Sequence, residues 1–238
     1  MEYFKIIDEH EKLNKGQQKQ HRDFVDVMLS YLNQPMNPND EEQTYIIDQT
    51  NIKAIILDMI ATALKTSTIV IEWVLAEIIR HPRVKSRLQK ELETVVGMNR
   101  IVEEANLANL TYLDMVIKES LRLHPVAPLL IPHESMEDVT IHGYYISKKS
   151  QILINISTIR RDPNLIPFGS GRKGCPGLQL GLTTVRLVLA QLVHCFEWEL
   201  PHGMLPNDLS ISERSRLTAP RAQQLLAKPV YRLPDKRL

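Results

Sequence analysis

One short stretch, FGSGRKGCPG at residues 168–177, places four glycines and two adjacent cations around a single thiol, Cys175. Glycine permits positive φ angles and a close approach of the backbone to a bound group, so this turn can present a thiol to a flat ligand. The apolar run from Leu178 predicts a helix directly afterwards, and a helix N-terminus favours a thiolate. Thiolate is an axial ligand of haem iron, and Arg172 and Lys173 can pair with the carboxylates of the macrocycle. The stretch therefore favours a haem-thiolate site.

The second thiol, Cys195, lies in the run LVHCFEW and lacks such surroundings, so we expect a buried apolar side chain there. Two cysteines in 238 residues cannot form a disulfide framework, and neither belongs to a CxxC pair. These observations exclude the disulfide-rich class and argue against a structural zinc site. Lys plus Arg total 29 against 28 for Asp plus Glu, so we expect no nucleic-acid partner.

The hydrophobic pattern predicts a mainly α protein with a small β-sheet. The longest apolar run, from about Glu42 to Arg80, contains neither glycine nor proline and is stopped by the His-Pro pair at 81–82. Further helices are expected within 24–31 and over 83–96, 110–123 and 178–196, and a strand pair with a His-Gly turn within 139–153. Charged residues interrupt the most apolar region, 54–79, so we expect no membrane span.

Two further patterns are weak when they are considered alone. Glu119 and Arg122 lie three residues apart on one face of the predicted helix 110–123, where opposite charges can pair. Such a pair is usually a solvated surface pair. Thr66 lies in the middle of the longest predicted helix, where a threonine usually faces solvent or bonds its own backbone. Neither pattern predicts a function without further context.

The cysteine stretch resembles the haem-ligand signature of the cytochrome P450 superfamily, FxxGxRxCxG, with lysine at 173 where the family has arginine. This resemblance implies haem b as the cofactor and Cys175 as the ligand of its iron. Lysine keeps the charge but lacks the planar fork with which arginine grips a propionate. The residues expected around the cofactor are Phe168, Gly171, Arg172, Lys173, Cys175 and Gly177.

The same resemblance assigns roles outside the cysteine stretch. Glu119 and Arg122 look like the family's ExxR pair, which is buried and braces the core around the haem. Thr66 and Ser67 look like the end of the oxygen-side pattern of the long helix, so they are the expected catalytic residues. Lys65 stands where the family has a proton-relaying acid. The expected substrate-pocket residues are Ala61, Thr62, Val126, Ala127 and Leu129.

Longer runs such as KESLRLHPVAPLLIPHES are similar to those of the plant microsomal A-type monooxygenases. The resemblance implies insertion of one oxygen atom from O2 into a small apolar substrate, with electrons from NADPH delivered by an NADPH-cytochrome reductase. It also implies the cytosolic face of the endoplasmic reticulum membrane. This chain shows no anchor and is itself expected in the cytosol.

The chain resembles a C-terminal fragment with an internal deletion. We expect one partial cytochrome P450 domain over residues 1–238, lacking the N-terminal half of the family and a segment between Asn164 and Leu165 that contains a PERF-like sequence. Two alternatives stay open. One is a truncated, catalytically inactive haem-binding or non-functional fragment, and the other is a helical interaction module in which the cysteine stretch is fortuitous.

Overall fold

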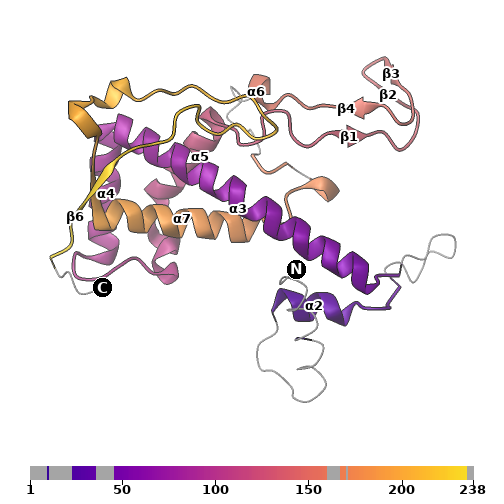
Figure 1. Cartoon of the computed structure of the whole chain (residues 1–238), viewed down its shortest axis with the longest axis horizontal. Helices are drawn as coiled ribbons and strands as arrows, with labels where there is room; N and C mark the ends of the chain where they lie inside the picture. The colour runs from indigo at the N-terminus through magenta and orange to yellow at the C-terminus, as the bar shows by residue number, and fades with distance from the viewer. Residues whose placement is uncertain (1–9, 11–22, 36–45, 160–166, 170, 235–238) are drawn as a thin grey trace. The chain divides into compact units, whose positions relative to one another are not determined.

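A computed structural model describes residues 10, 23–35, 46–159, 167–169 and 171–234 (Figure 1). The chain divides into two compact units, Met1–Leu64 and Lys65–Leu238, and helix α3 (Gln49–Arg80) runs from the first into the second. The described part is mainly helical, and its strands form three two-stranded antiparallel sheets. The mainly α fold class predicted from the sequence is therefore confirmed, whereas the single partial domain stays a prediction.

The first unit contains α2 (Phe24–Ser30) and the beginning of α3. The sequence predicted a start of the long helix near residue 42, but residues 46–48 are not helical and 42–45 lie outside the described residues. The start is fixed by a reciprocal cap. Asn51 N–H donates to Asp48 Oδ1 at 2.7 Å, and Asp48 N–H donates to Asn51 Oδ1 at 3.0 Å. Satisfying free amides in this way is how polar side chains define a helix N-terminus.

The second unit holds the other elements, and its three longer helices begin and end within one residue of the predicted bounds. The helices are α4 (Pro82–Val96), η1 (Glu104–Asn109), α5 (Thr111–Leu123), α6 (Ile156–Ile159), η2 (Gly171–Lys173), α7 (Leu178–Cys195), η3 (Pro201–Gly203) and η4 (Pro206–Asp208). The strands are β1 (His133–Glu134), β2 (Val139–Ile141), β3 (Tyr144–Ile146), β4 (Gln151–Ile152), β5 (Phe196–Glu199) and β6 (Lys228–Tyr231).

Local backbone signals explain where these elements turn. Helix α4 begins with Pro82, whose missing N–H needs no partner in a first turn, and ends at Gly97 with φ of +85°. Strands β2 and β3 pair Ile141 with Tyr144 across a two-residue turn. That turn is His142 and Gly143, with φ of +49° and +84°. The predicted hairpin at the His-Gly dipeptide is therefore confirmed.

One apolar core organises the second unit. Helix α7 packs against α4, α5, η1 and β5. Apolar side chains from the end of α3 and from α4, α5 and α7 form a single buried cluster, and each large member stabilises the fold by about 1.5–3 kcal/mol through burial. Cys195 at the end of α7 is buried, as predicted. Fully buried members of this core include Val74, Leu88, Leu92, Leu113 and Leu189.

Among the described residues, α3 and α7 are long and apolar enough to cross a membrane. The sequence had favoured no span because charges interrupt the apolar run. Core helices of proteins without a membrane meet the same criterion. The packing of α7 against its neighbours gives it the surroundings of such a core helix.

A carboxylate from α4 caps the N-terminus of α5. Glu91 accepts hydrogen bonds from Tyr112 N–H at 2.7 Å and from Leu113 N–H at 3.0 Å. These two amides belong to the first turn of α5, where no intrahelical acceptor exists. The negative charge of Glu91 also interacts favourably with the positive end of the helix dipole. Glu91 therefore fixes α5 relative to α4. The α5 sequence does not reveal this cap, because the capping side chain comes from another helix.

We predict that Glu91→Ala lowers the free energy of unfolding by about 1–2 kcal/mol, because two amides of α5 lose their acceptor. Urea denaturation followed by circular dichroism measures this loss. Lys90→Ala is the matched control, since Lys90 is exposed on the same turn of α4. Equal effects of the two substitutions would contradict the capping role.

Candidate functional site

The cysteine stretch forms a closed turn. Cys175 N–H donates to Phe168 O at 2.9 Å, and Gly174 N–H donates to Gly171 O at 3.0 Å within the turn. The Phe168 side chain packs against the apolar core, so one end of the turn is anchored in the body of the second unit. The backbone around Cys175 is therefore held by main-chain bonds.

Two glycines make this turn possible. Gly169 and Gly171 have φ of +71° and +67°, a region in which a side chain strains the backbone. Gly177 precedes α7 as its N-cap residue. A Cβ added there would lie 4.0 Å from Cys175 Sγ, which is ordinary contact. The turn and the following helix match the sequence prediction in position.

The thiol of Cys175 is exposed and lies just before the first turn of α7. Lys173 is also exposed, and Phe168 is half-buried beside the turn. An exposed thiol, a neighbouring cation and a helix N-terminus form a donor set that suits a thiolate ligand of haem iron. Ser170 and the side chain of Arg172 lie outside the described part of the chain. The residues present fit the group that the sequence predicted.

The predicted charge pair of α5 forms, but it is not buried. Arg122 donates from Nε to Glu119 Oε2 at 2.7 Å and from Nη2 to Glu119 Oε1 at 2.6 Å. These bonds hold the pKa of the Glu119 carboxyl below its ordinary value. The side chain of Glu119 is 56% exposed, and that of Arg122 is 30% exposed. The expected burial is therefore wrong for this chain, because no described segment covers this face of α5.

The segment expected to line a substrate pocket is held through its backbone. Val126 O accepts from Ala219 N–H at 2.9 Å, and Pro128 O accepts from Ile156 N–H at 2.8 Å. Val126 and Ala127 are half-buried, whereas Leu129 is 44% exposed. Segments distant in sequence thus fix the path of residues 126–129. Their contact with a substrate stays a prediction.

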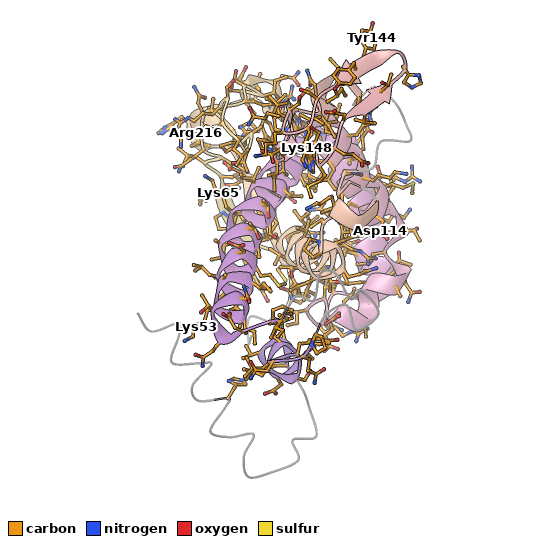
Figure 2. The ribbon with its side chains drawn as sticks, turned by 90° about the vertical axis from the view of Figure 1, so that its right-hand side faces the viewer. Lys53, Lys65, Asp114, Tyr144, Lys148 and Arg216 are labelled. Carbon is orange, nitrogen blue, oxygen red and sulfur yellow. The ribbon has the colours of Figure 1, made fainter. Side chains whose placement is uncertain are left out.

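The predicted residues of α3 fall in different surroundings. Thr66 and Ser67 are half-buried, and Lys65 is exposed near the middle of the helix (Figure 2). Because the Lys65 side chain is exposed, its presence costs the fold little. Ala61 and Thr62 belong to the first unit and are exposed, and Thr62 Oγ1 donates to Asp58 O at 2.7 Å. The catalytic and pocket roles of these four residues stay predictions.

A polar cluster that the sequence pattern did not predict lies at the end of α5. The ring of His124 stacks on Trp73 with 3.8 Å between centroids and 5° between planes. His124 Nε2 lies 2.9 Å from Glu77 Oε1, and Nδ1 lies 3.5 Å from Glu213 Oε1. A signal was present, because Trp73 and Glu77 lie four residues apart and therefore on one face of α3. In the sequence His124 is marked only by the proline that follows it, and a proline at this position ends a helix.

The cluster keeps Glu77 ionised. The hydrogen bond with His124 is the main cause that holds the pKa of the Glu77 carboxyl below its ordinary value of 4.5, and the nearby charges of Arg80 and His81 act in the same direction. A carboxyl whose pKa is lowered by folding stabilises the fold above its ordinary pKa. That contribution is lost as the pH falls through the lower, folded-state pKa.

The closed turn, the exposed thiol and the helix that follows are the features expected of the haem-thiolate class of proteins. The sequence profile of the family described as Cytochrome P450 matches residues 3–165 and 164–226 of the chain. The chain therefore belongs to the cytochrome P450 family, whose members are haem-thiolate monooxygenases with haem b as cofactor.

Similar proteins come from several plants. Cytochrome P450 CYP736A12 of Panax ginseng is 50% identical over 255 residues, which cover 96% of this chain and 51% of the relative. Cytochrome P450 84A1 of Arabidopsis thaliana is 39% identical over 96% of this chain and 51% of its own length. Cytochrome P450 71A1 of Persea americana is 39% identical over 90% of this chain and 47% of its own length. The chain spans about half the length of the curated relatives it matches.

We predict that Glu119→Gln leaves the urea midpoint of this chain unchanged, because an exposed ion pair is screened by water and ions. Urea denaturation at neutral pH measures the midpoint. A clear fall would show that the pair braces the core despite its exposure.

A second substitution tests the buried cluster. Glu77→Gln is expected to lower the free energy of unfolding at neutral pH by about 1–3 kcal/mol, because a charge-assisted hydrogen bond to His124 is lost. The difference between parent and variant should shrink as the pH falls from about 7 to about 3, where the parent carboxyl becomes protonated. Glu199→Gln removes an exposed carboxylate near Lys228 and serves as the control. A difference that stays constant with pH would contradict this assignment.

Proposed function

We propose that this chain binds haem b and that Cys175 is the thiolate ligand of its iron. The observation that supports this most strongly is the closed turn from Phe168 to Cys175, which holds an exposed thiol at the start of α7. The exposed thiol lies two residues after Lys173 and directly before the first turn of α7, where it is accessible to a ligand. Arg172 and Lys173 would pair with the propionates, and Phe168, Gly171 and Gly177 would form the rest of the cradle.

The activity proposed for this site is insertion of one oxygen atom from O2 into a small apolar substrate. When bound, the haem supplies the oxygen-activating chemistry. The hydroxyls of Thr66 and Ser67 would hold and pass protons at their Oγ atoms. Val126, Ala127 and Leu129 would provide apolar walls that exclude water. Ala61 and Thr62, which belong to the first unit, are proposed as further pocket residues from the family resemblance alone. Similarity to plant members of the family supports this assignment.

The electron donor and the location are proposals of the same kind. NADPH-cytochrome reductase would deliver electrons from NADPH, as the resemblance to the plant microsomal monooxygenases implies. The family's place at the cytosolic face of the endoplasmic reticulum membrane is the proposed site of action. Incubation with reductase, NADPH and a panel of small apolar compounds tests the activity. Haem binding without NADPH-dependent product would identify a haem-binding fragment without monooxygenase activity.

We further propose that the chain is one partial domain that lacks an internal segment between Asn164 and Leu165. The family profile matches in two parts that meet at these residues. The alignment with the Panax ginseng relative runs over 255 residues, which exceeds the 238 residues of this chain. The relative therefore carries residues that have no counterpart here. Sequencing the transcript beside its genomic locus tests this proposal, and a continuous exon across the junction would contradict a skipped segment.

Cys175→Ala tests the ligand directly. The parent chain, expressed with a haem precursor, reduced and exposed to carbon monoxide, should show the strongly red-shifted Soret band of a thiolate-ligated complex. Cys175→Ala should lose this band because the sulfur that donates to iron is gone. Cys195→Ala, which removes the buried thiol at the end of α7, should keep it. Absence of the band from the parent, or its persistence in Cys175→Ala, would contradict the proposal.

A further inference from the structure

Trp73 of α3 makes a hydrogen bond, a ring stack and a cation contact in the core of the second unit. Its side chain is 1% exposed, and its indole N–H donates to Ala219 O at 3.0 Å. The ring stacks on His124, and the guanidinium carbon of Arg221 lies 5.1 Å from the ring centre. Tryptophan buries a large apolar surface and still requires a partner for its N–H. Trp73 therefore fixes both the C-terminal segment that contains Ala219 and the residue that follows α5.

Ala219 transmits this contact to the segment 126–129. Its carbonyl accepts from the Trp73 indole, and its own N–H donates to Val126 O at 2.9 Å. Two hydrogen bonds in series thus connect α3, through one buried residue, with the backbone of Val126. Ala219 is 4% exposed, so water is poorly placed to replace either bond.

Backbone hydrogen bonds fix the position of the C-terminal segment around Ala219. Arg214 N–H donates to Pro220 O at 2.9 Å, and Ala222 N–H donates to Ser212 O at 2.8 Å. Further along, Leu225 N–H donates to Glu72 Oε1 at 2.9 Å, which ties the segment to α3 a second time. Ala219 therefore cannot follow a displaced Val126 without breaking these bonds. Residues 126–129 contain no helix or strand, so such contacts determine where they lie.

We propose that Trp73 is a positioning residue for the pocket wall formed by Val126 and Ala127. By holding Ala219, its indole N–H sets the distance of this wall from a bound ligand, and it thereby sets which apolar ligands fit. Trp73 itself need not touch the ligand. The inference rests on the proposed function, because it uses the assignment of residues 126–129 to a pocket in a haem-loaded protein. It adds a residue, and a route of action, to that assignment.

Trp73→Phe tests the inference, since phenylalanine keeps an aromatic ring but has no N–H. Trp198→Phe is the matched control. It makes the same chemical change at an indole that donates to Leu192 O at 3.0 Å. In the haem-loaded chain, the dissociation constants of imidazole and of a phenyl-substituted imidazole are measured by their Soret shifts. Both ligands bind iron through the same nitrogen, so the ratio of their constants isolates contact with the pocket wall.

A second readout does not require haem. Amide hydrogen exchange measured by mass spectrometry reports on the segments 126–130 and 217–221, and on α4 and α7 as references. In Trp73→Phe we expect exchange to accelerate about fivefold at the two segments, and the ratio of dissociation constants to change by about fivefold, as for one lost buried hydrogen bond. In Trp198→Phe the ratio should stay within about twofold of the parent.

The outcomes separate this inference from the proposed function. A parent chain without a thiolate-type carbon monoxide spectrum overturns the proposed function, and the exchange data then decide alone whether Trp73 positions residues 126–129. A parent ratio retained in Trp73→Phe overturns the inference in a protein that binds haem normally. Equal acceleration throughout α4 and α7 also overturns it, because that result indicates general destabilisation. If Trp73→Phe does not fold, Ala219→Pro removes the N–H that donates to Val126 while keeping Trp73, and the same criteria apply.

Discussion

The hydrogen bond from Cys175 N–H to Phe168 O is the constraint on which the candidate site depends. It closes a turn whose other end is anchored by the Phe168 side chain in the apolar core. Gly169 and Gly171 allow the backbone to enter the left-handed region twice within this turn. The outcome is an exposed thiol directly before a helix, a position in which its sulfur is accessible to a metal ion.

The same core also positions the other elements of the site. Helix α7, which follows the cysteine, packs against α4 and α5, and the cap from Glu91 fixes the latter two helices relative to each other. The end of α3 contributes Trp73 and Glu77, which hold His124 and Ala219. The turn that contains Cys175 and the segment 126–129 are therefore both held by the same packed core. A change in that body would move both of them.

The sequence was sufficient to predict a structural feature wherever the residues that determine this feature are neighbours in the chain. Pro82 and Gly97 mark the ends of α4 in the sequence, the His-Gly dipeptide predicted a hairpin, and the glycines around Cys175 predicted its turn. It was insufficient wherever partners are distant in the chain. The burial of Glu119 depends on segments that would cover α5, and the stacking of Trp73 on His124 joins residues 51 positions apart. Spacing within one helix places Trp73 and Glu77 on one face of α3, but it does not identify the distant residue that contacts this face.

X-ray absorption at the iron edge of the haem-loaded chain tests the sulfur ligand most directly. The expected spectrum contains one sulfur scatterer in the first coordination shell, and this scatterer should disappear in Cys175→Ser, in which an oxygen replaces the sulfur in the same turn. A first shell of nitrogen and oxygen alone in the parent protein would contradict the assignment of Cys175 as the ligand.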